Sequence, residues 1–166
     1  MEIREISAFL DYYKKIRART MRVITSIPHE QLEWTYEEGK FTFGDLIRHL
    51  GSIERYMYAE NAQFKPSTYP GHGEELASGY TATIQYLNDC HEASLAIFEK
   101  LTPEDLNKKT LTPAGTPITL WKWLRAMIEH EIHHRGQIFI YLGMIGEKSP
   151  PLYGLTAEEV QEKSKS

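Results

Sequence analysis

Apolar residues recur at helical spacing in four long segments of the chain. Within each segment they lie three or four positions apart, which makes one face of a helix apolar and leaves the opposite face polar. The predicted helices cover residues 6–27, residues 42–63, residues from between 74 and 80 to 101, and residues 119–142. No stretch of useful length alternates apolar and polar residues with a period of two. The pattern therefore predicts an all-α protein, a four-helix bundle.

Proline, glycine and capping residues mark where these helices begin and end. Pro28 ends the first helix, Thr42 with Asp45 three residues later is a capping pattern for the second, and Gly143 closes the fourth. We predict a loop at residues 104–116 and an irregular tail after the fourth helix, with at most a short turn near 156–162. The predicted organisation is one bundle domain at residues 1–146 followed by a C-terminal tail at residues 147–166.

Composition and charge argue against several classes of protein. With 19 basic and 23 acidic residues, the chain carries a formal net charge of −4, whereas a nucleic-acid-binding protein usually presents a basic face. No segment approaches the ~18 apolar residues of a membrane span, and no signal-peptide core is present. The single cysteine, Cys90, cannot form an intrachain disulfide and fits a reducing compartment. We expect a soluble, cytoplasmic protein with no nucleic-acid or membrane partner.

Three of the seven histidines fall within five residues of the fourth predicted helix. His130 and His134 are four positions apart on its apolar stripe, so they project from one face, where two imidazoles can bind one divalent ion. A third ligand must come from another helix. His49, at the edge of the second helix's stripe, is the best candidate, and His91 on the third helix is the alternative. Three histidines with an open coordination position are typical of catalytic metal sites.

The same segment also fits the zinc-peptidase pattern H-E-x-x-H, in which the glutamate, here Glu131, activates water. This short match is weak evidence, because a helix with three histidines produces it easily. The longer metzincin pattern needs Gly and His where the chain has Gln137 and Ile140. No edge strand for binding a peptide backbone is predicted either. A zinc-dependent hydrolase of this kind is therefore the weakest alternative.

A longer pattern links the second and fourth helices. It consists of Phe43, His49-Leu50, Glu54 and His130-x-x-x-His134-Arg135-Gly136-Gln137. The pattern resembles the DinB/YfiT-like family, and the resemblance extends from the first helix to Gly143. It implies a four-helix bundle, commonly dimeric, that holds zinc or nickel through one histidine of the second helix and an H-x-x-x-H pair of the fourth. Carried over to this chain, the ligands are His49, His130 and His134, the set that helix geometry also favours.

Residues beside the histidine pair have predicted roles of their own. Gln137 lies one turn beyond His134, where it can hydrogen-bond a metal-bound water or a ligand. We expect Arg135 to form an ion pair at the surface or at an interface, and His133, a quarter-turn from His134, to face solvent or to lie outside the ligand set. His72 lies in a loop and has no partner that the sequence identifies.

The resemblance implies thiol-transfer chemistry on a small-molecule substrate. In such proteins the metal binds and activates a low-molecular-weight thiol, such as bacillithiol or mycothiol, because a divalent cation lowers the pKa of a bound thiol. No catalytic cysteine is then needed, which agrees with the position of Cys90 away from the histidine stripe. The alternative is a metal-containing stress or interaction protein without turnover, in which a fourth ligand such as Glu131 or His91 closes the site.

Overall fold

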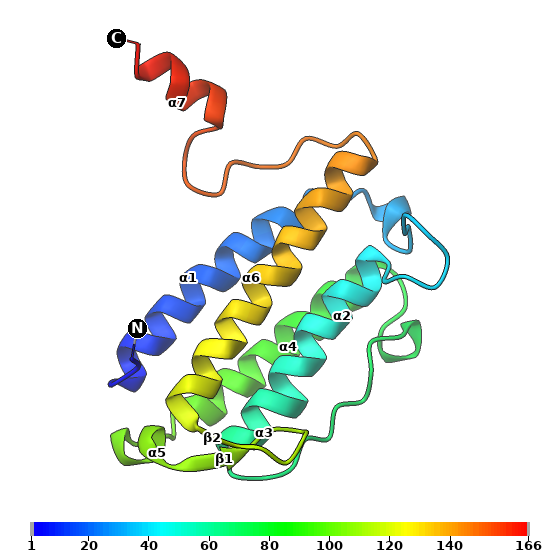
Figure 1. Cartoon of the computed structure of the whole chain (residues 1–166). Helices are drawn as coiled ribbons and strands as arrows, with labels where there is room; N and C mark the ends of the chain where they lie inside the picture. The colour runs from blue at the N-terminus through cyan, green and yellow to red at the C-terminus, as the bar shows by residue number, and fades with distance from the viewer. Residues whose placement is uncertain (1, 166) are drawn as a thin grey trace.

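Four long helices lie side by side and form the body of the protein (Figure 1). The computed structural model describes residues 2–165. The bundle helices are α1 (Ile6–Ile24), α2 (Phe43–Ile53) with its continuation, α4 (Tyr80–Phe98) and α6 (Leu120–Met144), and short 3-10 turns η1 (His29–Gln31) and η3 (Glu74–Leu76) lie in the connections. Helix α1 packs against α6, and α2 packs against α4. The predicted all-α four-helix bundle is confirmed, and the helix ends lie close to the predicted ones.

The second bundle helix is continuous but is not α-helical throughout. It begins at the predicted capping box, in which the backbone N–H groups of Thr42 and Asp45 donate to each other's side chains at 3.0 and 2.9 Å. After α2 a π-helical turn, η2 (Glu54–Tyr58), leads into α3 (Ala59–Ala62). A π turn inserts one residue and shifts the face that follows it, and such turns are frequent at functional sites. Glu54, the first residue of this turn, is buried in the bundle interior.

The interior is divided into two apolar clusters with a layer of polar side chains between them. The clusters include Phe9, Phe98 and Leu124 at one end of the bundle and Val23, Leu87 and Ile138 at the other. Each of the four bundle helices contributes a charged or titratable side chain to the layer between them. These side chains are Arg17 from α1, Glu54 from η2, the partly buried His91 from α4 and Glu131 from α6.

Residues 104–116 do not form the predicted loop. The segment contains α5 (Pro103–Asn107), β1 (Lys109–Leu111) and, just beyond it, β2 (Pro117–Thr119). Helix α5 starts at a capping box between Thr102 and Asp105, and the two strands pair antiparallel with Lys109 opposite Thr119. The prediction is wrong because strands of three residues are too short to show alternation. The Thr102 to Asp105 spacing is, however, itself a helix-start signal.

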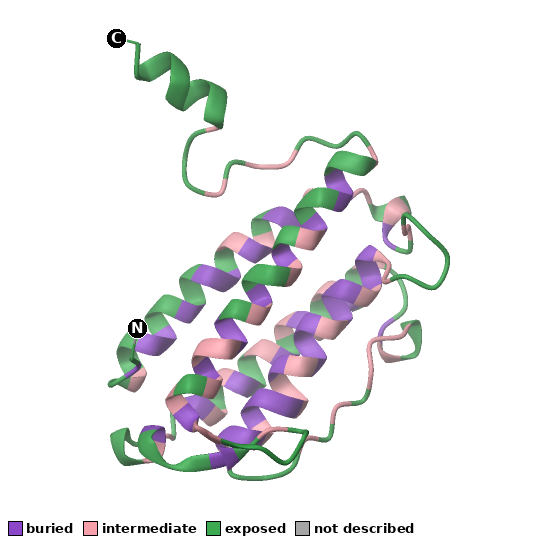
Figure 2. Ribbon diagram, in the orientation of Figure 1, coloured by how far each residue is buried: buried purple, intermediate pink, exposed green. Residues whose placement is uncertain are grey.

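The C-terminal tail is more regular than predicted, because it ends in α7 (Ala157–Lys163), which begins at a capping box between Thr156 and Glu159. The tail first passes along α1, where Arg22 Nη2 donates to the Leu152 carbonyl at 2.9 Å. Helix α7 then projects away from the bundle with its side chains exposed (Figures 1 and 2). The domain boundary at residue 146 stays a prediction. Within residues 2–165 no helix is long and apolar enough to span a membrane.

Candidate metal centre

The Nε2 atoms of three histidines converge where α2 faces the middle of α6. His49 Nε2 lies 3.1 Å from His130 Nε2, which lies 3.2 Å from His134 Nε2. Nitrogen ligands of a tetrahedral zinc ion with bonds of 2.0–2.1 Å lie about 3.3–3.4 Å apart. The same three residues form the only group of potential metal ligands found within residues 2–165. The structure therefore brings together the three histidines that the sequence predicts, and their nitrogens are spaced to fit one divalent ion.

Hydrogen bonds on the far side of the rings orient two of these histidines. His134 Nδ1 lies 3.0 Å from Gln137 Oε1 and His49 Nδ1 lies 2.7 Å from the Tyr69 hydroxyl. An amide oxygen only accepts, so His134 Nδ1–H donates to it and the lone pair of His134 is on Nε2, facing the other histidines. Partners of this kind hold metal-ligating imidazoles in place. Gln137 thus orients the His134 ring, while its predicted contact with a bound water or substrate stays a prediction.

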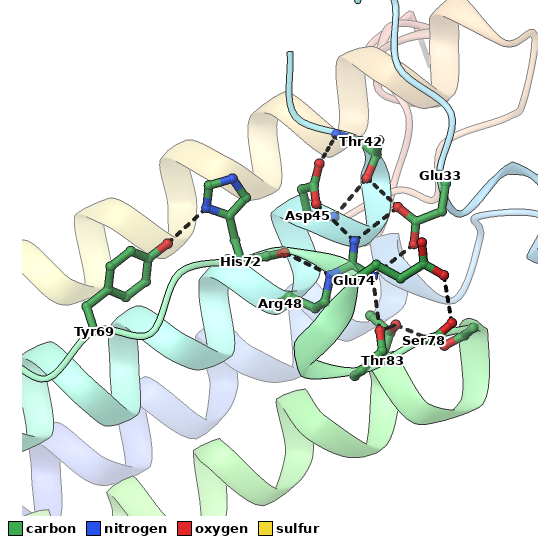
Figure 3. Close-up of polar contacts among 11 residues, drawn as sticks. Glu33, Thr42, Asp45, Arg48, Tyr69, His72, Glu74, Ser78 and Thr83 are labelled. Carbon is green, nitrogen blue, oxygen red and sulfur yellow. Dashed lines mark hydrogen bonds and ion pairs between the residues drawn. The ribbon is translucent and has the colours of Figure 1, made fainter. Parts of the chain in front are cut away.

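His72, a loop histidine for which the sequence identifies no partner, is linked to the converging histidines by hydrogen bonds. The Tyr69 hydroxyl lies 3.2 Å from His72 Nδ1 (Figure 3). Because the same hydroxyl lies 2.7 Å from His49 Nδ1, Tyr69 connects His72 to His49. The loop is held by Arg48, which is fully buried and donates from Nε to the His72 carbonyl at 2.8 Å and from Nη1 to the Ala77 carbonyl at 3.1 Å. Sequence periodicity misses this connection because Tyr69 and His72 lie outside any helix.

Burial keeps the three imidazoles neutral. Loss of solvation, followed by the neighbouring imidazoles, lowers the pKa of His49 to about 3. The same two causes lower the pKa of His130 to about 4. Burial also lowers the pKa of His134, although the hydrogen bond to Gln137 opposes this shift. Only a neutral imidazole has a lone pair for a metal ion, so at neutral pH all three are in the form that binds.

The metal-free protein is expected to lose stability on acidification below about pH 6.5, where these imidazoles titrate in an unfolded chain. His49 and His130 titrate only near pH 3 and pH 4 when folded. Between these pH values and about pH 6.5 the unfolded chain binds more protons than the folded protein, so the unfolded population rises as the pH falls. The contribution of the neutral imidazoles to the free energy of unfolding is fully present only above about pH 6.5. Urea unfolding should show a lower midpoint at about pH 5 than at about pH 7.5.

The control for this pH effect is His133→Ala, which removes an exposed imidazole of the same helix. It should keep the difference between the two midpoints, whereas His49→Phe should reduce it. A midpoint that is equal at both pH values in the wild-type protein would contradict the prediction.

The remaining candidate ligands are engaged elsewhere. His91 Nδ1 lies 2.8 Å from Glu54 Oε1, so the rival third ligand is not part of the group. Glu131 is buried and lies 3.0 Å from Arg17, so it is not placed to activate water beside the histidines. His133 is exposed, as predicted.

The predicted role of Arg135 is wrong. Instead of forming an ion pair at the surface or at an interface, its side chain is only 3% exposed, and Nη1 donates to the Ile16 carbonyl at 3.4 Å. The reason is that α1 covers this side of α6.

An open groove at the surface reaches His134. A cavity of about 320 Å³ is lined by His134 and Gln137 together with the aromatic rings of Tyr36, Phe41 and Tyr141. A second cavity, of about 570 Å³, shares Tyr36, Gln137 and Tyr141 with the first and continues along the exposed side of α6. A small molecule can therefore approach His134 between apolar surfaces.

A family model described as the DinB superfamily matches residues 12–138 of the chain. Over 64 residues the chain is 41% identical to the uncharacterized protein YjoA of Bacillus subtilis (strain 168). This segment is 37% of the chain and 42% of YjoA, so the match spans less than half of that relative.

Three solved structures share the architecture over most of their length. A DinB-like protein from Bacillus cereus ATCC 10987 has a TM-score of 0.73 and 19% identity, covering 90% of this chain and 99% of its own. The structure of YjoA from Bacillus subtilis has a TM-score of 0.70 and 20% identity, covering 88% of this chain and 96% of its own. YfiT from Bacillus subtilis has a TM-score of 0.70 and 15% identity, covering 89% of this chain and 91% of its own. It is described as a probable metal-dependent hydrolase with an unusual four-helix bundle topology. At these identities the likeness shows the fold.

Proposed function

The chain belongs to the DinB superfamily, and we propose that it is a metal-dependent enzyme in which His49, His130 and His134 hold one divalent ion. The observation that carries this proposal is the convergence of three neutral Nε2 atoms at spacings of 3.1 and 3.2 Å. Three imidazoles leave a coordination position for a substrate. Zinc or nickel is the proposed ion, and imidazole donors suit both.

We propose that the reaction transfers a low-molecular-weight thiol, such as bacillithiol or mycothiol, to an electrophilic carbon. The thiol loses its proton to solvent, and its sulfur forms a C–S bond while the bond from that carbon to a leaving group such as chloride breaks. A bound divalent ion lowers the pKa of a thiol and so supplies thiolate at neutral pH. Tyr36, Phe41 and Tyr141 line the groove beside His134 and bind the apolar part of the substrate while excluding water. Gln137 and Tyr69 hold the rings of His134 and His49.

The protein's own cysteine does not suit the role of nucleophile. Cys90 is buried, and burial raises the pKa of its thiol to about 11, so almost none of it is thiolate at neutral pH. The thiolate must then come from the co-substrate, which supports a thiol-transfer reaction that depends on the metal rather than on a protein thiol.

Zinc-loaded or nickel-loaded protein is expected to conjugate 1-chloro-2,4-dinitrobenzene with at least one of bacillithiol, mycothiol, coenzyme A and glutathione. The reaction should stop when the metal is removed and should continue in Cys90→Ser. Absorbance of the thioether product measures the rate, and the uncatalysed rate with each thiol is the control. Full activity without metal, combined with loss of activity in Cys90→Ser, would refute the mechanism.

Hydrolysis is the second candidate, because the solved YfiT structure is described as that of a probable metal-dependent hydrolase. The same preparations assayed with ester and amide substrates distinguish the two reactions. The third candidate is a metal protein without catalytic activity, in which a fourth protein ligand fills the open coordination position. Glu131 and His91 are already paired with Arg17 and Glu54, which favours the open site.

We also propose that the protein forms a homodimer, as the family resemblance implies. Apolar side chains on the outer side of α6 support an interface there, since Ile140 and Met144 are 60% and 57% exposed. Light scattering coupled to size-exclusion chromatography would determine the mass in solution.

A further inference from the structure

A third cavity lies apart from the two that adjoin His134 and the outer side of α6. It has a volume of about 530 Å³ and lies between the chain after α3 and the β1–β2 hairpin. The two walls are joined because Thr110 Oγ1 donates to the Asn61 carbonyl at 2.6 Å. Tyr69 belongs to the wall as well, and its hydroxyl lies 2.7 Å from His49 Nδ1. The cavity therefore lies between two segments that are held together, and Tyr69 connects it to the candidate metal centre.

Two lysines that line this cavity, Lys65 and Lys109, lack a carboxylate partner within residues 2–165. Within residues 2–165, neither Lys65 nor Lys109 has a carboxylate at ion-pairing distance. Lys65 Nζ donates to Gln63 Oε1 at 3.1 Å and Lys109 Nζ donates to Thr119 Oγ1 at 2.8 Å. Each ammonium has three N–H donors, so donors on both remain for a ligand. In a chain of net charge −4, this pair of unneutralised cations favours an anion.

Apolar side chains form another part of the wall. Phe64, Pro66, Leu111 and Pro113 line the cavity, and Phe64 and Leu111 are 44% and 58% exposed. Phe64 also adopts a φ of +60°, a left-handed backbone conformation that a bulky residue rarely takes. Such conformations persist where the surrounding structure enforces them, and they cluster at ligand-binding sites. The wall thus combines cations with an exposed apolar surface.

We propose that this cavity binds a small amphiphilic anion, an apolar ring or chain that carries a carboxylate or phosphate group. Lys65 and Lys109 bind the anionic group, and Phe64, Leu111 and Pro113 cover the apolar part. The ligand also contacts Tyr69, which adjoins the metal centre. Binding depends on the hairpin and on the two lysines, and it does not depend on the metal.

The test is a calorimetric titration of the full chain, metal-free and zinc-loaded, with 1-naphthoate and with 1-naphthyl phosphate. Neutral 1-naphthol is the control ligand. At least one anion should bind at a single site, more tightly than 1-naphthol, and the preferred anion identifies the carboxylate or phosphate source. The double variant Lys65→Ala/Lys109→Ala should weaken binding by about tenfold or more, since charge-assisted hydrogen bonds are lost. The matched variant Lys14→Ala/Lys100→Ala, which removes two exposed lysines from other surfaces, should bind as the wild type does.

Amide shifts in a ¹H–¹⁵N NMR titration should locate the anion at residues 64–69 and 109–115, and Thr112→Trp should block it. His134→Ala, which removes a metal ligand, should leave binding intact, so loss of the metal-dependent reaction and loss of this site are distinguishable. The proposal is overturned if neither anion binds saturably, if 1-naphthol binds as tightly, or if the lysine double variant binds unchanged.

Discussion

Replacing Arg17 with methionine is expected to lower the free energy of unfolding by about 3–5 kcal/mol. The Arg17 guanidinium is buried, with Nη2 at 2.5 Å from Glu54 Oε2 and at 3.0 Å from Glu131 Oε2. Burial disfavours the cation, but Glu131 and Glu54 raise the pKa of Arg17, so it stays charged. Methionine fills similar space and leaves two desolvated carboxylates without a cation, which costs more than the intact pair contributes.

Glu131 is the main reason why the stability of the folded protein depends on Arg17. Its oxygens have no hydrogen-bond partner within residues 2–165, because the nearby Arg17 nitrogen lies at ion-pairing distance but outside hydrogen-bonding geometry. The charge of Glu131 is therefore stabilised mainly by the field of the guanidinium. For the same reason, the double variant Arg17→Met/Glu131→Gln should recover part of the loss.

The matched control is Arg125→Met on the surface of α6. Arg125 forms an ion pair with Glu129 at 3.1 Å, but the two side chains are 41% and 63% exposed, so its loss should cost less than about 1 kcal/mol. Urea unfolding of the metal-free variants measures both effects. An Arg17→Met variant that is no less stable than Arg125→Met would show that the buried layer does not depend on this cation.

Alanine in place of His49, His130 or His134 is expected to abolish retention of the divalent ion while the bundle stays folded. Two imidazoles from a set of three cannot hold the ion through a gel-filtration step, whereas the apolar clusters at both ends of the bundle do not include these residues. Zinc and nickel contents of tag-free protein, measured by mass spectrometry, and far-ultraviolet circular dichroism test the two parts of the prediction. Metal should raise the melting temperature of the wild type but not of these three variants.

His91→Ala and His133→Ala are the controls for the ligand set. Both change a histidine outside the converging group, so both should retain metal. Loss of metal from His91→Ala with retention by His49→Ala would assign the third ligand to α4. A random-coil spectrum of the metal-free wild type would show that the metal is structural, contrary to the presence of two apolar clusters.

The sequence by itself determined the four helices and the placement of two of the three histidines of the site. Helical periodicity is a local property, so the spacing of apolar residues defined α1, α2, α4 and α6 and the face that each one buries. The four-residue spacing of His130 and His134 placed both rings on one face for the same reason. These conclusions needed no knowledge of which helix lies beside which.

Only the tertiary structure shows which of the two candidate histidines lies beside His130 and His134. The sequence favours His49 over His91, but both border apolar stripes, and periodicity does not show which ring faces the histidine pair. The packing of the helices turns His49 toward His130, and it turns His91 toward Glu54, 2.8 Å away. The pairing of these helices depends on contacts between residues far apart in the chain, which local spacing does not encode.

The same limit explains the other differences between prediction and structure. Arg135 lies inside because α1 covers that side of α6, where it donates to the Ile16 carbonyl. Tyr69 reaches His49 because Arg48 holds the His72 carbonyl, a contact between a helix and a loop. The β1–β2 hairpin depends on pairing between strands of three residues that have no periodicity of their own. Local spacing determines which faces are buried, whereas long-range packing decides which polar groups meet there.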